Sequence, residues 1–395
     1  MSTASPLQRG GLARFAVASG VAIGVIYLPQ QLLTLIGEDF DVDPALASAT
    51  ATSMQIGYAL GILLLVSLSD RAPTRRLVDI MSLATVALLA LAALSPALPV
   101  LCVLLGAAGG TTTIAQVLLP TALRAASPGH RGRTTGIMLG AFIIGIFGTR
   151  IVESWVAEAV GWRLTLVVFA AAMLAAALLV RGAVPKTRPN ARAAPYGRIL
   201  LSLPRLFATV GPLRLGGLTQ FFMFAAFQAV WVTLVLHLTA PPHSWSISQA
   251  GLAGGVGILA GLCTIVIGPA VDRFGSGAVV RVTLLAGITG AALILFGADV
   301  IPLLLLGLFA LTLANQVGQA GNQAAALTAA GPERSGSANT VFMFLTFLGS
   351  SFGSAAAPIA FGWGRLEGVA LFGIACFCAA GVLQGLAWAR SRRTR

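Results

Sequence analysis

The chain alternates between long apolar runs and short polar segments. An α-helix needs about 20 apolar residues to cross a bilayer, and counting runs of that length predicts twelve spans. They lie near residues 12–35, 46–69, 77–95, 99–124, 134–157, 163–182, 212–237, 246–271, 278–297, 301–328, 337–361 and 367–389. The runs do not alternate at every second position, so they favour helices over the strands of a membrane barrel. The pattern predicts an all-α integral membrane protein with twelve transmembrane helices.

The longest polar segment divides the twelve predicted spans into two sets of six. It contains "VPKTRPNARAAPYGR", which holds the only lysine of the chain. Proline and arginine favour an extended linker here, with a short surface helix near 196–203. The sequence therefore predicts an N-terminal six-helix bundle at 1–182, a cytoplasmic linker at 183–211 and a C-terminal six-helix bundle at 212–395.

The two predicted bundles share landmarks at a nearly constant spacing. The pair Asp70-Arg71 recurs 202 residues later as Asp272-Arg273. Three further landmarks recur after 204 residues: Pro128 as Pro332, Gly132 as Gly336, and Gly145 as Gly349. Ordered landmarks at one spacing indicate an internal duplication. The bundles are therefore expected to be pseudo-symmetric.

Composition and charge agree with a membrane protein and fix its predicted orientation. Charged residues make up 9% of the chain, against about 25% in soluble domains. The net charge of +13 does not indicate a nucleic-acid binder, because the arginines fall in alternate loops. Of the 25 basic residues, only Arg150, Arg163 and Arg365 lie elsewhere. The positive-inside rule then places both termini in the cytoplasm. The arginine-rich composition favours a bacterial cytoplasmic (inner) membrane.

The duplicated Asp-Arg pair lies in a recognisable motif. The first copy reads "VSLSDRAPTRR" and the second "GPAVDRFG". This resembles the signature G-x-x-x-D-R-x-G-R-R of the major facilitator superfamily, and the resemblance covers nearly the whole chain. The matching positions are Asp70, Arg71, Arg75 and Arg76 in the first copy and Gly268, Asp272, Arg273 and Gly275 in the second. Val66 and Pro73 stand where the signature has glycine.

The resemblance implies a secondary transporter that works by alternating access. In that architecture Asp70 lies near the start of the eleventh span, and Asp272 lies near the start of the fifth. A helix N-terminus favours a nearby carboxylate, so both contacts are expected to act as a gate. The alternative is a solvated turn whose charges only set orientation. A narrower resemblance, to bacterial drug:proton antiporters, rests on "YLPQQLLTLIGEDFDVDPALASA" and "GTRIVESWVAEAVGWR".

Two ionisable residues lie inside the fifth predicted span. Arg150 and Glu153 are three residues apart, so they share one helix face. Ionisable residues within a span are costly and usually functional. Glu153 is the candidate proton-carrying residue, and Arg150 is a candidate for binding an anionic substrate. The alternative is an ion pair near the outer interface.

Amide and aromatic side chains mark a candidate substrate cavity. Asn315, Gln319 and Asn322 recur at i, i+4 and i+7 in the tenth predicted span, and hydrocarbon does not tolerate such a stripe. In the resembled family, spans 1, 4, 7 and 10 line the cavity. The other candidates in those spans are Tyr27, Gln30, Gln31, Gln116, Gln220, Gln228, Trp231 and Gln323. The alternative is a set of hydrogen bonds between helices.

These features predict a transporter rather than an enzyme. The favoured function is proton-coupled efflux of a small drug-like or metabolite molecule. Proton-coupled uptake is the first alternative, and a non-transporting receptor or scaffold is the second. The four cysteines lie within apolar runs without metal-ligand spacing, so no metal and no cofactor are predicted. The predicted protein is a monomer whose partners are its substrate, protons and the lipid bilayer.

Overall fold

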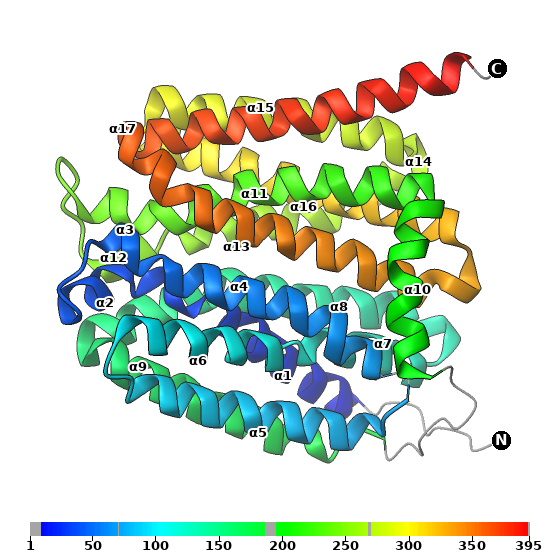
Figure 1. Cartoon of the computed structure of the whole chain (residues 1–395), viewed down its shortest axis with the longest axis horizontal. Coiled ribbons are helices and arrows are strands. Elements are labelled where there is room, and N and C mark those ends of the chain that lie inside the picture. Colours follow the sequence, from blue (N-terminus) through cyan, green and yellow to red (C-terminus); the bar gives the residue numbers. More distant parts are fainter. Residues whose placement is uncertain (1–8, 70, 186–194, 268–269, 394–395) are drawn as a thin grey trace. The chain divides into compact units, whose positions relative to one another are not determined.

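The structure is a computed structural model that describes residues 9–69, 71–185, 195–267 and 270–393. Within these ranges the chain forms helices and short connections, with no strand, which confirms the predicted all-α class. The chain divides into two compact units, unit 1 at Met1–Arg198 and unit 2 at Ile199–Arg395. In Figure 1 unit 1 runs from blue to green and unit 2 from green to red. The predicted boundaries of the bundles and linker stay predictions.

Unit 1 is built from short and long helices joined by tight turns. Its elements are α1 (Arg9–Tyr27), η1 (Leu28–Gln31), α2 (Leu33–Asp39), α3 (Pro44–Ala47), α4 (Ala49–Gly61), η2 (Ile62–Val66), α5 (Thr74–Ala93), α6 (Leu98–Thr111), α7 (Ile114–Ala125), η3 (Pro128–His130), α8 (Arg131–Ile143), η4 (Ile144–Gly148) and α9 (Thr149–Arg181). The elements η1 and η3 are 3₁₀ turns, whereas η2 and η4 are π-helical. Helix α4 runs beside α6, and α5 runs beside α9 (Figure 1).

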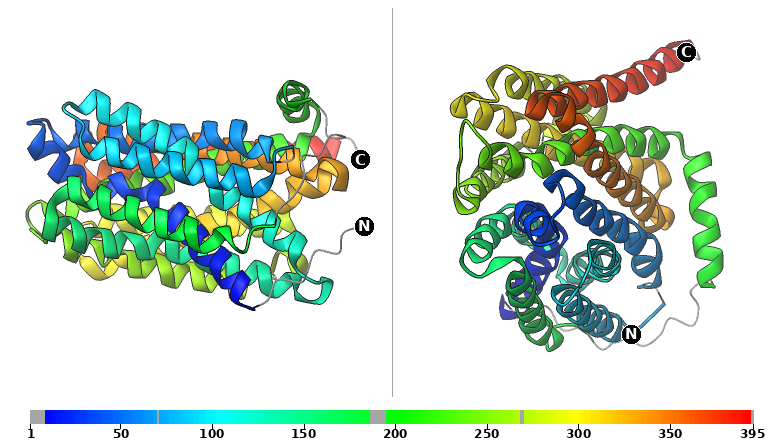
Figure 2. Two further views of the ribbon diagram at one scale, coloured as in Figure 1. Left: turned by 90° about the horizontal axis from the view of Figure 1, so that it is seen from below. Right: turned by 60° about the vertical axis from the view of Figure 1, so that its left-hand side comes forward.

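Unit 2 contains longer helices. Its elements are α11 (Gly211–Thr239), α12 (Ile247–Gly251), α13 (Gly254–Ile267), α14 (Ala270–Phe274), α15 (Ser276–Gly297), α16 (Ile301–Ala330), η5 (Pro332–Arg334) and α17 (Ser335–Arg393). Helix α10 (Tyr196–Thr209) begins at the end of unit 1 and covers the short helix predicted near 196–203. Within unit 2, α11 packs along α17 and α15 packs along α16 (Figure 2).

Ten of the helical segments in the described residues are long and apolar enough to cross a membrane. The two longest, Arg131–Arg181 and Pro332–Arg390, each contain a break. The first break is at Gly161, with φ 77°, and the second is at Gly364–Arg365. Both breaks fall where the sequence predicts a loop between two spans. The count of twelve spans and the sides of the termini stay predictions.

Apolar side chains lie both inside each unit and on its surface. Unit 1 has one buried cluster around Leu32, Leu89 and Leu166, and another around Phe15 and Met81. Large apolar residues are also exposed on spanning helices, among them Leu83, Leu178, Leu285 and Phe296. A soluble surface rarely presents so many contiguous apolar side chains. The bilayer is the environment that fits them.

Close helix packing at small residues recurs in both units. In unit 1, a methyl group on Gly145 would overlap the carbonyl oxygen of Gly20, so η4 lies directly against α1. In unit 2, a methyl group on Gly349 would overlap the carbonyl oxygen of Phe221, so α17 lies directly against α11. Small residues let helix backbones approach in this way. Gly145 and Gly349 are one of the predicted repeat pairs, and each has the same role in its own unit.

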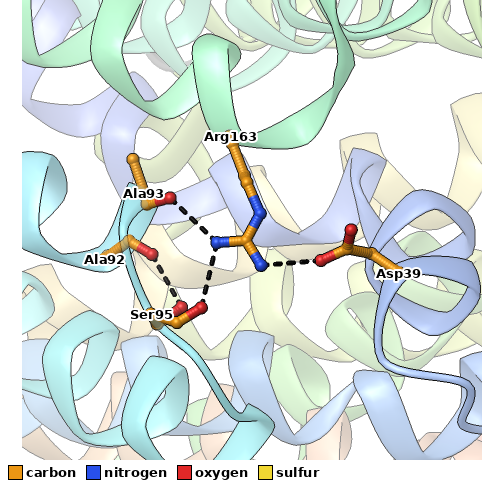
Figure 3. Close-up of polar contacts among 5 residues, drawn as sticks. All are labelled: Asp39, Ala92, Ala93, Ser95 and Arg163. Carbon is orange, nitrogen blue, oxygen red and sulfur yellow. Dashed lines mark hydrogen bonds and ion pairs between the residues drawn. The ribbon is translucent and has the colours of Figure 1, made fainter.

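The structure explains why Arg163 lies outside the cytoplasmic arginine pattern. Just after the break at Gly161, its guanidinium fills the space between two loops (Figure 3). It donates to the carbonyl oxygens of Ala93 and Ser95, each at 2.9 Å, and forms an ion pair with Asp39 at 2.7 Å. In unit 2, Arg365 follows Gly364 and donates to the carbonyl oxygen of Pro241 at 2.6 Å. Arg163 and Arg365 are 202 residues apart, so these two arginines are repeat equivalents that anchor loops.

Candidate transport site

A buried pair of charged residues occupies the first turns of α9. Arg150 and Glu153 are both 0% exposed. They follow the π-helical turn η4, whose wider winding sets the direction in which α9 starts. Arg150 acts electrostatically on Glu153, as expected for two side chains three residues apart on one helix. The two residues are therefore both buried on one face of α9, and the roles predicted for them stay predictions.

The Arg150 guanidinium is held by groups from α1 and η4. Its Nε donates to the carbonyl oxygen of Ile146 at 3.2 Å. The guanidinium carbon lies 5.1 Å from the ring centre of Tyr27 and 6.0 Å from that of Phe147, within the range of cation–π attraction. Tyr27 ends α1, which approaches η4 through Gly20 and Gly145. The close packing of glycines thus brings the aromatic ring to the buried cation.

The same cluster includes polar groups after α1. Pro29 is the second residue of the 3₁₀ turn η1, which also carries Gln30 and Gln31. Ser154 Oγ donates to Gln31 Oε1 at 3.2 Å and to the carbonyl oxygen of Arg150 at 2.7 Å. Ser154 was not among the residues predicted from the sequence. Its position four residues after Arg150 was the available signal, because a serine there can reach back to the preceding turn.

Two buried side chains of this cluster have no hydrogen-bond partner among the described residues. They are the carboxylate of Glu153, at both oxygens, and the amide of Gln30, at both polar atoms. Buried polar groups are nearly always hydrogen-bonded, so each such exception calls for an explanation. Binding of a proton or a polar solute would account for both.

The remaining candidate of unit 1, Gln116, contacts a different helix. It lies in α7, just after the interruption at Thr112 and Thr113 that separates α6 from α7. Its Nε2 donates to the hydroxyl oxygen of Tyr58 at 3.2 Å. Thr112 Oγ1 donates to the carbonyl oxygen of Ala22 in α1 at 2.9 Å, which fixes the interruption. Tyr58 is a buried polar contact that the sequence analysis missed.

Unit 2 holds a cluster of amides, and no buried pair of charged side chains occurs among its described residues. Gln220 of α11 donates from Nε2 to Asn315 Oδ1 of α16 at 3.0 Å. Asn322, two turns further along α16, donates from Nδ2 to Gln220 Oε1 at 3.3 Å. The three side chains are buried. Hydrogen bonds between helices are therefore present at these residues, and the cavity-lining role predicted for them stays a prediction.

Other candidates of unit 2 fall into separate environments. Trp231 Nε1 donates to Thr312 Oγ1 at 3.2 Å, and both side chains are buried. Gln319 and Gln323 are half-buried and turn toward α17. Gln228 is fully buried, and neither polar atom of its amide has a hydrogen-bond partner in the described part of the chain. The predicted stripe of α16 is thus divided between α11 and α17.

The motif loops lie partly outside the described residues. Asp70 and Gly268 are outside them, and the side chain of Asp272 is not described either. Arg71 and Arg75 are half-buried and Arg76 is exposed, while the guanidinium of Arg273 lies 5.2 Å from the ring centre of Phe274. The predicted gating contacts stay predictions.

Proline at the first motif loop gives it a different turn from the second. Gly275 has φ 79° and ψ 149°, a conformation that glycine adopts readily and other residues avoid. Pro73, 202 residues earlier, has φ −58° and ψ 115°. The proline ring fixes φ near −65°, so the first loop must enter α5 by another path. The first loop leads into α5 and the second leads into α15.

Comparison with known proteins agrees with this architecture. The sequence pattern of the Major Facilitator Superfamily matches residues 12–354. A protein of Streptomyces coelicolor named "Probable transporter SCO4007" is 32% identical over 360 residues, which cover 90% of this chain and 83% of that protein. The "Uncharacterized transporter YgaY" of Escherichia coli is 30% identical over 239 residues, 60% of each chain.

Solved transporter structures share the fold. The nucleoside transporter NupG has a TM-score of 0.74 and 13% identity, with 96% of this chain and 99% of that chain covered. A peptide transporter, POT, in complex with alafosfalin has a TM-score of 0.75 and 14% identity, with 99% and 97% covered. A multi-pass helical transporter is the class that the fold defines. The chain belongs to the Major Facilitator Superfamily.

Proposed function

We propose that this transporter exports a small organic molecule in exchange for protons. The observation that carries the proposal is the carboxylate of Glu153, which is 0% exposed and has no hydrogen-bond partner among the described residues. Carboxylates within spans serve as proton relays in pumps and transporters. Glu153 is the proton carrier in this proposal. In this proposal Arg150, one turn earlier on α9, lowers the free-energy cost of the negative charge on Glu153.

Each unit is proposed to offer a substrate a buried amide of its own. Gln30 and Gln228 each present a complete amide without a partner in the described residues. Such a group can bind a hydroxyl, amide or amine of a solute with both a donor and an acceptor. In α11 the ring centres of Phe227 and Trp231 lie 6.1 Å apart, and these aromatic rings suit a solute with an apolar body. A drug-like or metabolite molecule of mixed polarity fits this combination.

The motif loops are proposed to control the alternation between open states. Asp70 and Asp272 would act as carboxylates near helix N-termini, a contact worth up to about 2 kcal/mol when partly buried. A free energy of that size biases an equilibrium between two states without freezing it. The support for this role is the motif itself, present in both repeats at a spacing of 202 residues.

Transport in inverted membrane vesicles tests the coupling. Respiration acidifies the vesicle lumen and quenches acridine orange, and a substrate that enters in exchange for protons restores the fluorescence. Ethidium, a Hoechst dye and a panel of hydrophobic amines serve as probes. We expect at least one probe to restore fluorescence with the wild type. Glu153→Gln should abolish that response.

A matched control lies on the same helix. Glu158 is exposed on α9, so Glu158→Gln removes an acid without touching the buried cluster. It should behave as the wild type. Recovery of fluorescence in Glu153→Gln would show that another group carries the proton. If whole cells accumulated a probe only when they contain the protein, the direction of transport would be uptake and not efflux.

A further inference from the structure

Two histidines and an aspartate meet at one end of unit 2, away from the clusters described above. His237 lies in the last turn of α11, His243 in the loop that follows, and Asp299 between α15 and α16. The side chains of His237 and His243 are 1% and 8% exposed, and Asp299 is 61% exposed. The arginine pattern predicts that this end of the unit faces outward.

The donor atoms of these three residues lie close together. The distance from His237 Nε2 to Asp299 Oδ1 is 4.0 Å, and from His243 Nε2 to the same oxygen it is 3.8 Å. One ligand atom from each residue lies within 4.8 Å of the other two. Ligands around a tetrahedral zinc ion are about 3.4 Å apart, given metal–ligand bonds of about 2.0–2.1 Å. All three ligand atoms would therefore have to move closer together on metal binding, and the exposed Asp299 carboxylate has the most room to do so.

The loop that carries His243 is fixed in place by several contacts. Trp245 N donates to the carbonyl oxygen of Leu238 at 2.9 Å, and Ser244 N donates to that of Ala240 at 3.0 Å. Arg365 holds the carbonyl of Pro241, and a capping box of Ser246 and Gln249 begins α12 directly afterwards. A loop constrained in this way presents its imidazole in a defined direction. Preorganised ligands are what a metal site requires.

Two ring nitrogens of the cluster, His237 Nδ1 and His243 Nε2, have no hydrogen-bond partner among the described residues. His243 Nε2 is buried and faces Asp299. His237 Nε2 lies 3.0 Å from the carbonyl oxygen of Ala298. Metal binding would give His243 Nε2 a partner and would replace the contact of His237 Nε2 with a metal–nitrogen bond. The Ala298 oxygen or a water molecule would then complete the coordination.

We propose that His237, His243 and Asp299 form a binding site for a divalent transition metal ion, with Zn²⁺ the best fit. Two imidazoles and one carboxylate are ligands that zinc prefers, and they exclude the all-oxygen chemistry of magnesium and calcium. The other charged groups near His237 are Arg365 and Glu367. With Asp299 they leave a net negative charge beside the imidazoles, which favours a cation. The bound ion ties the end of α11 to the α15–α16 loop.

Calorimetry on the full-length protein tests the site. The protein is purified in detergent with a tag that contains no histidine, stripped with a chelator and titrated with ZnCl₂ near pH 7.5, where imidazoles are neutral. We expect one saturable ion per chain. His243→Gln and Asp299→Asn should each weaken binding by about tenfold or more, since even supporting residues outside the ligand set contribute that much.

The third histidine of the chain supplies a matched control. His130 is exposed in η3 of unit 1, where its Nδ1 forms a hydrogen bond with Ser127 Oγ. His130→Gln should therefore leave zinc affinity unchanged. Cobalt substitution provides a second readout, because nitrogen and oxygen ligands give a visible spectrum without the charge-transfer band of a thiolate. Size-exclusion profiles verify that each variant is folded.

Four outcomes would overturn the proposal. The first is the absence of saturable binding by the wild type, and the second is equal zinc affinity in wild type, His243→Gln and Asp299→Asn. The third is a thiolate band in the cobalt spectrum, which would assign the metal to a cysteine. Thermal stability that depends on pH in wild type but not in His243→Gln, and that does not respond to zinc, would assign the cluster a protonation role instead. None of these readouts involves transport.

Discussion

The two units differ in how they bury polar side chains. Unit 1 encloses a charged pair, and its helices are interrupted at η1, at the π-helical turns η2 and η4, and at Thr112–Thr113. Unit 2 encloses amides, and α11 and α16 run through 29 and 30 residues without a break. These units are repeats by their landmarks, so the difference has arisen within one architecture.

The comparison shows that buried charge and irregular backbone occur together here. A guanidinium away from water needs hydrogen-bond acceptors, and a backbone carbonyl can supply one through its second lone pair. Arg150 finds one at Ile146, inside the π-helical turn. Amides instead act as donor and acceptor for one another, so Gln220, Asn315 and Asn322 satisfy each other from two regular helices. The buried charge of unit 1 thus lies beside a π-helical turn, whereas the amide cluster of unit 2 joins two unbroken helices.

Removing half of the charged pair should have the largest effect. Arg150→Ala leaves Glu153 buried without its compensating charge, and such a loss typically costs about 3–5 kcal/mol. We expect the free energy of unfolding, measured by denaturant titration in detergent, to fall by that amount. The double variant Arg150→Met with Glu153→Leu should recover most of it, since apolar residues of similar volume remove both charges. If Arg150→Ala lowered the free energy of unfolding by less than about 1 kcal/mol, the buried charge of Glu153 would not depend on Arg150.

Widening the close contact of α1 with η4 should come next. Gly145→Val forces a side chain against the carbonyl of Gly20, and overpacking of this kind costs about 1–3 kcal/mol. The equivalent change in unit 2, Gly349→Val, should cost a similar amount, because Gly349 is equally close to Phe221. Gly140→Val is the control, since a methyl group there meets nothing within 4 Å. Equal stability of Gly145→Val and Gly140→Val would refute the proposed packing role.

Removing either loop-anchoring arginine should lower the free energy of unfolding by less than Gly145→Val does, and the two losses should differ. Arg163 makes three hydrogen bonds and Arg365 makes the one that the structure describes. Because the Arg163 side chain is 38% exposed, water offsets part of each bond, and we expect Arg163→Ala to cost about 1–2 kcal/mol. Arg365→Ala should cost about half of that. Hydrogen exchange at the loops should rise near residues 93–95 in the first variant and near residue 241 in the second.

Breaking the amide cluster should have the smallest effect on stability. Gln220→Leu removes two hydrogen bonds between α11 and α16, and such bonds within membranes average about 0.6 kcal/mol. The expected loss of about 1 kcal/mol is well below that for Arg150→Ala, and the difference between them measures what charge adds. Gln323→Leu is the matched control, because it removes an amide hydrogen bond to α17 and leaves the bonds between α11 and α16 in place. An effect of Gln220→Leu as large as that of Arg150→Ala would remove the distinction between the units.

Parts of the candidate site could be predicted from the sequence because they depend on neighbours within one helix. Arg150 and Glu153 are three residues apart, and helical geometry alone places them on one face. Asn315 and Asn322 follow the same rule, and both are buried against Gln220 as the exclusion of amides from hydrocarbon requires. Gln319 obeys the same spacing but turns toward Met343 of α17, because the stripe is wider than the contact with α11.

Other contacts could not be predicted, since they join segments far apart in the chain. Arg163 reaches Asp39 and the turn at Ala93, and nothing in its own neighbourhood indicates either partner. His243 and Asp299 are also far apart in sequence, and their spacing matches no metal-ligand motif. The π-helical turn before Arg150 also left no pattern, because its residues are as apolar as those of a regular helix.

The sequence by itself determined the all-α membrane class, the duplicated motif and the family. Each of these follows from short-range periodicity, composition or spacing, which reflect whether a residue meets lipid, protein or water. Only the tertiary structure decided the partners of Arg150, the division of the amide stripe and the meeting of His237 with His243 and Asp299. Those depend on how closely helices approach, which small residues such as Gly20 and Gly145 set through packing over long sequence distances.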